Sequence, residues 1–269
     1  MRYRRSFREL VGGQLVAIAV TLVVLALTGG LLVLLEPGTP NSAAPVNSVS
    51  GTGARSVSPG AFGSGTLGPW QGLVKHISSD DDIRDTLMFN GVFMFGDSIA
   101  VQDGAALEQL LRNRTGDSIA VHDWSGQPTS AAVDALEDWE RRFGLPSRIV
   151  MAVGSNDIFD PPAFAAQVER GMHIAGPSRT LYWVNVHVAR ARQPADVRAA
   201  DQANSAWINQ QLEQTAGRHP NLRIIHWAEY LATQPGGPAD YLRDGIHTSE
   251  SLGRDARNEL IVGALEGSR

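Results

Sequence analysis

The sequence predicts an α/β fold in which a five-stranded parallel sheet carries helices on both faces. From residue 88 onward, short apolar runs alternate with segments whose apolar residues recur at helical spacing. The first run, residues 92–95, is apolar without interruption, which is typical of a parallel strand covered on both sides. Repeated strand–helix units of this length favour a parallel sheet, since parallel neighbours need a crossover connection.

The individual elements follow in chain order. Strands are predicted at residues 92–95, 119–122, 148–153, 180–186 and 222–227. Helices are predicted at residues 103–111, 131–143, 161–172, 201–215 and 249–265. Asp103 can cap the first of these helices, and Pro161 suits the first turn of the third.

Residues 70–86 predict a further helix that packs on the domain. Trp70, Leu73, Val74 and Ile77 are spaced as on one helical face, and three aspartates follow at residues 80–82. We interpret the aspartates as a solvated turn. Metal binding by this acidic run is the alternative.

The N-terminal part of the chain predicts a membrane attachment. Arginines occur within residues 1–9, and the apolar stretch at residues 10–35 is long enough to cross a hydrocarbon core of about 30 Å. Because a cleaved signal usually has a shorter apolar region, we expect a retained anchor with the domain outside the cytoplasm. A cleavage site at residues 42–44 is one alternative. A start at Met88, giving a cytoplasmic protein, is another.

Composition separates the anchor from the folded part. Residues 36–69 are rich in Gly, Ser, Pro and Thr and predict a flexible linker, so residues 70–269 form the predicted catalytic domain. The net charge of −5 and the lack of a basic stripe in the domain give no reason to expect a nucleic-acid partner. The chain has no cysteine, which excludes disulfides, zinc–thiolate sites and a cysteine nucleophile.

Four short polar blocks fall where predicted strands end or the last helix begins. Such positions meet at the carboxyl edge of a parallel sheet, where ligands bind. The blocks are Gly96-Asp97-Ser98, Trp124-Ser125-Gly126-Gln127-Pro128-Thr129, Gly154-Ser155-Asn156-Asp157 and Asp244-Gly245-Ile246-His247. Together they supply a hydroxyl nucleophile, an imidazole base, a carboxylate to orient it, and donors for an oxyanion.

In the order and placement of these blocks, the sequence resembles the SGNH (GDSL-type) hydrolase superfamily over residues 88–265. The resemblance implies a flavodoxin-like three-layer sandwich, no cofactor, no metal, and a Ser–His–Asp mechanism that acts on acyl esters. The turn at Ser98 lacks the second glycine of a G-x-S-x-G elbow, which argues against the α/β-hydrolase fold.

The resemblance also implies a role for each matching residue. Ser98 would be the nucleophile, His247 the general base and then acid, and Asp244 the residue that orients the imidazole. The oxyanion would be held by the backbone N–H groups of Ser98 and Gly126 and by the side-chain amide of Asn156.

Each role has a structural alternative. Ser98 could cap the following helix, Gly126 could be a turn glycine, and Asn156 could hold its loop in an Asx turn. Asp244 and His247 could form a surface capping pair ahead of the last helix.

Three neighbouring residues are candidates for contact with the substrate. Trp124 could form an aromatic wall of an acyl or sugar pocket. Asp97 and Asp157 are candidates too, although turn and scaffold roles suit them better than catalysis. The remaining histidines lack the spacing of a metal site.

An acyl-enzyme can be resolved by an alcohol or by water. The residues Asn185-Val186-His187-Val188 and the layout up to His247 resemble SGNH domains that acylate carbohydrate hydroxyls, such as those attached to membrane O-acetyltransferases and the mycobacterial diglucosylglycerate octanoyltransferase. We therefore expect an acyl donor (thioester or ester) and a carbohydrate acceptor. An esterase is the alternative, and a non-catalytic membrane-tethered binding module is a remote one.

Overall fold

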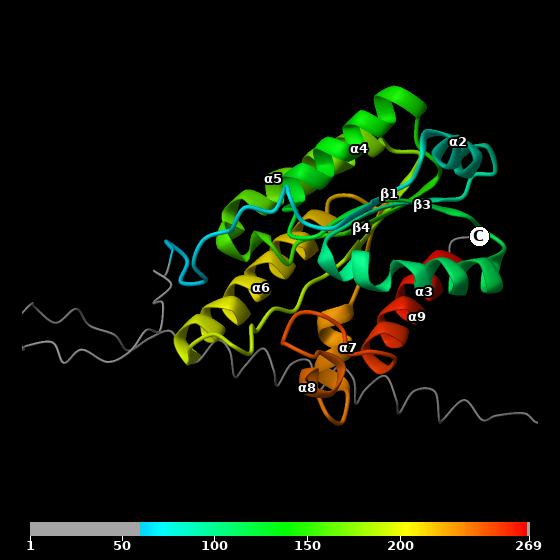
Figure 1. The fold of residues 1–269 in the computed structure, drawn as a ribbon. Coiled ribbons are helices and arrows are strands. Elements are labelled where there is room, and N and C mark those ends of the chain that lie inside the picture. The colour runs from blue at the N-terminus through cyan, green and yellow to red at the C-terminus, as the bar shows by residue number, and fades with distance from the viewer. Residues whose placement is uncertain (1–59, 268–269) are drawn as a thin grey trace, which may run out of the picture. The chain divides into compact units, whose positions relative to one another are not determined.

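The computed structural model describes residues 60–267 (Figure 1). The predicted anchor at residues 10–35 and most of the predicted linker lie outside the described residues. Between residues 60 and 267, no helix is both long and apolar enough to cross a membrane.

The centre of the fold is one six-stranded sheet of order β1-β3-β2-β4-β5-β6. The strands are β1 (Lys75–Ile77), β2 (Val92–Gly96), β3 (Ile119–Trp124), β4 (Arg148–Ala152), β5 (Thr180–Val184) and β6 (Leu222–Ile225). Strands β2 to β6 are parallel, which confirms the five predicted parallel strands, and β1 adds an antiparallel edge next to β3. The chain leaves β2 toward β3 and later returns to its other side at β4. A ligand-binding crevice is therefore expected beyond the end of β2.

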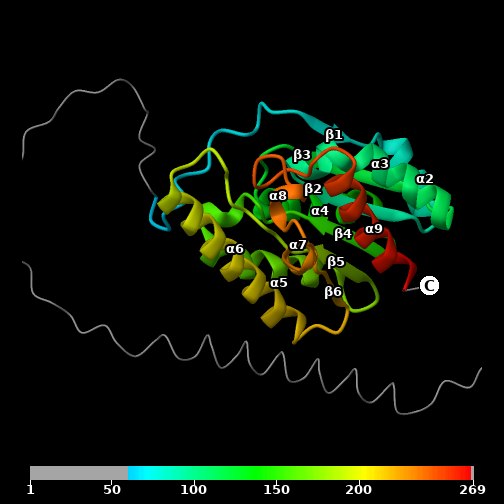
Figure 2. The same ribbon diagram turned by 90° about the horizontal axis from the view of Figure 1, so that it is seen from below.

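Helices cover both faces of the sheet (Figures 1 and 2). They are α2 (Asp80–Met88), α3 (Ser98–Thr115), α4 (Thr129–Phe143), α5 (Phe164–Ala175), α6 (Ala195–Ala216), α7 (Trp227–Thr233), α8 (Pro238–Tyr241) and α9 (Leu252–Glu266). Phe93 and Phe95 of β2 enter the core beneath α4, α5 and α6, whereas Val92 and Met94 enter the core beneath α3, α7 and α9. This alternation along a wholly buried strand explains its uninterrupted apolar run.

The prediction of a helix from Trp70 to Ile77 is wrong. Residues 71–73 form a turn and residues 75–77 form β1, which pairs Lys75 with Trp124 and Ile77 with His122. The three side chains of β1 are exposed, so no apolar face is buried there. The backbone bonds to β3, including Ser125 N–H to Val74 O at 2.9 Å, determine the conformation instead.

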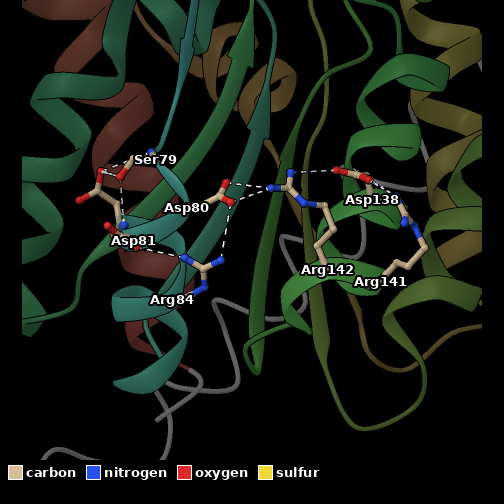
Figure 3. A network of polar contacts seen from close by, with 8 residues as sticks. Ser79, Asp80, Asp81, Arg84, Asp138, Arg141 and Arg142 are labelled. Carbon is tan, nitrogen blue, oxygen red and sulfur yellow. Dashed lines mark hydrogen bonds and ion pairs between the residues drawn. The ribbon is translucent and has the colours of Figure 1, made fainter.

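The three aspartates at residues 80–82 form the first turn of α2, where negative charge is favourable. Ser79 caps this helix and forms a reciprocal capping box with Asp82. An ion-pair network continues from this turn to α4 (Figure 3). Its members are Asp80, Asp81, Arg84, Asp138, Arg141 and Arg142. In the part of the chain that the structure describes, no cluster of side chains is arranged to hold a metal ion.

Several other boundaries differ from the sequence prediction. A short 3-10 helix occupies Pro161–Ala163, so α5 begins at Phe164, and α6 begins at Ala195 instead of residue 201. The first long helix begins at Ser98 and not at Asp103, because Asp97 caps it. Asp103 is instead buried in the helix and accepts a hydrogen bond of 2.9 Å from Thr248 Oγ1. The last predicted strand ends at Ile225, since Trp227 begins α7.

Residues 60–65, the end of the predicted linker, are bound to the domain and are not a free tether. Asn204 Nδ2 donates to Phe62 O at 2.9 Å and to Ser64 Oγ at 2.8 Å. Arg190 also donates to Ser64 O, and Ser64 is fully buried. From these contacts with α6 the segment runs to β1, the edge strand of the sheet (Figure 1). A chain that began at Met88 would lack this segment, β1 and α2.

Candidate active site

The candidate nucleophile lies where β2 meets α3. Asp97 Oδ1 accepts the backbone N–H of Ile99 at 2.9 Å, and Ser98 is the first helical residue. A Cβ at Gly96 would lie 2.1 Å from Ala100 Cβ, so only glycine permits this close turn from strand to helix. The Ser98 hydroxyl therefore sits at a helix N-terminus, where the local field favours negative charge.

Ser98, His247 and Asp244 form one hydrogen-bonded line. Ser98 Oγ lies 2.9 Å from His247 Nε2, and His247 Nδ1 lies 2.9 Å from Asp244 Oδ2. Asp244 Oδ1 also accepts the backbone N–H groups of Ile246 at 3.1 Å and His247 at 2.9 Å. With the Nδ1 proton donated to Asp244, His247 Nε2 is left to accept the hydroxyl proton of Ser98.

Asp244 is held in its ionised form. Partial burial alone would raise the pKa of Asp244. The hydrogen bonds from the backbone and ring of His247, the charge of its imidazolium and the Ile246 N–H together lower that pKa below its ordinary value. A carboxylate that stays ionised can orient the imidazole and stabilise its protonated form.

Gln127 joins three of the four blocks. Its side-chain amide donates to Gly96 O at the end of β2, and its backbone carbonyl accepts from Asn156 Nδ2 at 3.1 Å. Its backbone N–H binds Trp124 O at 3.1 Å. Gln127 is fully buried. Sequence analysis placed it in the second block but gave it no role of its own, since its importance rests on contacts with distant segments.

Each of the first three blocks contributes one available hydrogen-bond donor. Gly126 has φ +77°, and within residues 60–267 its backbone N–H has no hydrogen-bond acceptor. The N–H of Ser98, at the start of α3, has no acceptor there either. Asn156 uses one amide N–H on Gln127 and keeps a second. These groups have the chemistry of an oxyanion hole.

Asp157 ties the third block to α4. Thr129 donates to Asp157 Oδ2 through its backbone N–H at 3.0 Å and its hydroxyl at 2.8 Å. Burial, only partly offset by these hydrogen bonds, raises the pKa of Asp157 to about 6. Asp97 accepts its hydrogen bond from Ile99 and Asp157 accepts its hydrogen bonds from Thr129, so both carboxylates hold segments of the domain together.

Trp124 packs against a second tryptophan, Trp70, and sequence analysis proposed only Trp124 as a contact for the substrate. Its ring packs edge-on against Trp70, with ring centroids 5.0 Å apart, and Lys75 Nζ lies 4.4 Å from the ring centroid. A Cβ at Gly126 would lie 2.8 Å from Trp70 Cβ. Trp70 therefore lies directly against the second block, and it was missed because its segment was predicted to be a separate helix.

Buried charges lie behind the nucleophile. Burial raises the pKa of Asp97, and burial together with the nearby Asp97 raises the pKa of Asp123 well above its ordinary range. Arg257 of α9 is 2% exposed, and its positive charge opposes both shifts. Sequence analysis did not single out Arg257, because nothing in the local pattern of α9 marks it.

No protein-family model and no curated protein sequence is significantly similar to the chain. Several solved structures share its fold. A GDSL-like lipase from Bacteroides thetaiotaomicron is 14% identical with a TM-score of 0.55, and the match covers 72% of this chain and 93% of the lipase. A lipase/acylhydrolase from Enterococcus faecalis is 21% identical with a TM-score of 0.54, covering 66% of this chain and 95% of that protein.

A member of the lipolytic G-D-S-L family from Veillonella parvula is 17% identical, with a TM-score of 0.51. That match covers 65% of this chain and 96% of the relative. Each of these three proteins is thus matched over nearly its full length. The chain has the fold of the SGNH (GDSL-type) hydrolase superfamily.

Proposed function

We propose that this protein is a serine acyltransferase that moves an acyl group from an ester or thioester donor to a carbohydrate hydroxyl. The observation that carries the proposal is the line from Ser98 Oγ through His247 to Asp244, with both links at 2.9 Å. The available donors of Ser98, Gly126 and Asn156 support the proposal, because acyl transfer also requires donors for the oxyanion.

The first half-reaction forms the acyl-enzyme. His247 Nε2 takes the hydroxyl proton while Ser98 Oγ attacks the acyl carbonyl carbon of the donor. The oxyanion accepts hydrogen bonds from the N–H groups of Ser98 and Gly126 and from the Asn156 amide, and Asp244 stabilises the imidazolium. The tetrahedral intermediate then collapses, the bond to the leaving group breaks, and His247 returns the proton to that group.

The second half-reaction reverses the roles. An acceptor hydroxyl gives its proton to His247 Nε2 and attacks the acyl-Ser98 carbonyl, and Ser98 leaves with the proton from the imidazolium. Water in place of the alcohol would release a free acid, which is the esterase alternative. The side chains of His247 and Asp244 are 23% and 36% exposed, so this side of the site is accessible from solvent, and an acceptor can approach the imidazole from there.

Labelling with a fluorophosphonate tests the nucleophile. We expect one covalent adduct, located at Ser98 by peptide mass spectrometry and absent from Ser98→Ala. Ser130→Ala, which removes a partly exposed hydroxyl from α4, should be labelled like the native protein. Equal labelling of Ser98→Ala and the native protein would refute the covalent mechanism and favour the binding module.

Product analysis separates the transferase from the esterase. The protein is supplied with acyl thioesters and esters of several chain lengths, with and without sugar acceptors. We expect Ser98-dependent formation of a sugar ester at the expense of free acid. Free acid as the sole product, at a rate that no acceptor changes, would contradict the transferase and support the esterase.

A further inference from the structure

A cavity lined by arginines adjoins the candidate triad. Arg190, Arg192 and Gln193 form one wall, and Arg243, Asp244 and Ile246 form the other, around a volume of about 530 Å³. We call this cavity the arginine pocket. Because Asp244 belongs both to its lining and to the line that ends at Ser98 Oγ, the pocket borders the carboxylate end of the triad, two hydrogen bonds from the nucleophile. Its volume is within the range of small-molecule sites.

The two walls of the arginine pocket are fixed to each other. Ala189 N–H donates to Gly245 O at 2.9 Å, and Ala191 N–H donates to Asp244 O at 2.9 Å. A Cβ at Gly245 would lie 1.9 Å from Ala189 O, and its φ is +85°, so the close approach depends on glycine. The pocket is thus built by two pinned loops and does not need to be assembled by a ligand.

Not all of the positive charge in the arginine pocket is neutralised. Arg190 is paired with the fully buried Asp201 through Nε at 2.8 Å and Nη2 at 2.7 Å. Arg192 is exposed and forms no ion pair within residues 60–267. In the described part of the chain Arg243 forms one ion pair, with Asp244 at 3.7 Å, and that carboxylate already accepts three hydrogen bonds from Ile246 and His247.

We propose that the arginine pocket binds a carboxylate or phosphate group of the substrate and so directs a negatively charged donor or acceptor to Ser98. The inference rests on the proposed function and names the substrate class. Arg192 and Arg243 supply planar donor groups that match such oxyanions in geometry. A neutral substrate would leave Arg192 without a counter-charge and Arg243 with only the Asp244 carboxylate that it shares with His247.

Binding to the full-length Ser98→Ala protein in a nonionic detergent tests the proposal without turnover. Isothermal titration calorimetry compares coenzyme A with pantetheine for the donor, and D-glucuronate with D-glucose for the acceptor. We expect the charged member of one pair to bind at least tenfold more tightly, with an affinity that falls as salt is added. The pair that discriminates identifies whether donor or acceptor carries the charge.

Substitution locates the effect. Arg192→Gln should weaken binding of the preferred anion by about tenfold, as expected for the loss of a charged hydrogen bond. Arg223→Gln, which removes an exposed arginine near the amino end of β6, should bind like the parent. The proposal is overturned if neither anion binds more tightly than its neutral partner, or if both arginine variants behave alike.

The proposed acyl transfer through Ser98 and the proposed anion binding by the arginine pocket can be refuted separately. Anion discrimination that depends on Arg192, combined with no fluorophosphonate adduct on Ser98, would overturn the proposed function and keep the pocket. A Ser98 adduct without anion discrimination would support the proposed function and overturn the proposal for the arginine pocket.

Discussion

Three buried carboxylates surround the candidate nucleophile, and they differ in how they are held. Asp97 caps α3, and Asp157 accepts two hydrogen bonds from Thr129. Asp123 Oδ1 has no hydrogen-bond partner in the described part of the chain. Burial raises the pKa of all three carboxylates, which means that keeping them ionised in the domain interior costs free energy of folding.

Asp157 makes stability depend on pH in a predictable direction. The pKa of Asp157 is about 6 in the folded protein against an ordinary value of 3.8, so between these two pH values the folded state keeps a proton that the unfolded chain has lost. The contribution of this protonation to the free energy of unfolding is therefore complete below pH 3.8 and is lost as the pH rises through about 6. The shift corresponds to about 3 kcal/mol.

Urea denaturation of the native protein and Asp157→Asn at several pH values between 4 and 7.5 measures this term. The free energy of unfolding of the native protein should fall relative to that of Asp157→Asn by about 3 kcal/mol as the pH rises. Asp134→Asn, which changes an exposed carboxylate on α4, should show no such trend. A difference between native protein and Asp157→Asn that is independent of pH would contradict the raised pKa.

Local patterns located Ser98, Gly126, Asn156, Asp244 and His247, because each stands in a short polar block at the end of a strand or before a helix. The same patterns included Gln127 in the second block but could not predict its role, and they did not mark Arg257 at all. Gln127 acts through Gly96 O, 31 positions away, and Arg257 through the charges of Asp97 and Asp123. Their partners exist only in the folded chain.

The strand–helix junction at Gly96 explains why α3 begins earlier than its apolar spacing suggests. The helix pattern is strong only from Asp103 onward, whereas the cap at Asp97 starts the helix at Ser98. At the opposite edge, the spacing from Trp70 to Ile77 suited a helix, but pairing with β3 outweighed it. Buried strands were predicted well, since their apolar runs reflect burial on both faces.

The junction tolerates no side chain at Gly96. A Cβ there would lie 2.1 Å from Ala100 Cβ and 2.6 Å from Asp123 Oδ1. We expect Gly96→Ala to lower the free energy of unfolding by about 1–3 kcal/mol and to slow labelling of Ser98, because the start of α3 must shift.

Gly104→Ala is the matched control within α3. Its Cβ would lie 3.4 Å from Asp123 Oδ2, an ordinary contact, so the change should be neutral or stabilise the helix by up to about 1 kcal/mol. Denaturant unfolding and fluorophosphonate labelling check both variants. Equal stability of Gly96→Ala and Gly104→Ala would show that the junction is not close-packed.

Residues 60–65 are hydrogen-bonded to α6, and their composition did not predict this contact. Their small polar residues predicted a flexible linker, yet Ser64 is buried and Asn204 donates to Phe62, Ser64 and Ile158. The folded body therefore begins before the boundary that the sequence indicated.

Asn204→Ala should release this segment. We expect the backbone amides of residues 60–65 to lose protection in hydrogen-exchange mass spectrometry while β2 and β4 keep theirs. The global cost should be about 1–3 kcal/mol, since buried partners are left without a donor. Asn221→Ala removes a comparable donor to Gly176 O and Arg179 O and should leave residues 60–65 protected. Unchanged exchange in Asn204→Ala would contradict the anchoring role.

The contact between Asp244 and His247 joins positions three apart, whereas the contact between His247 and Ser98 joins positions 149 apart. The turn that holds the pair closes on itself, through Arg243 N–H to His247 O at 2.9 Å and the bridge between Leu242 and Thr248. If this turn lifts away, the imidazole and carboxylate travel together as an intact unit. Such a movement would break the hydrogen bonds from the Ala189 and Ala191 N–H groups to Gly245 O and Asp244 O, so these two bonds keep the pair aligned with Ser98.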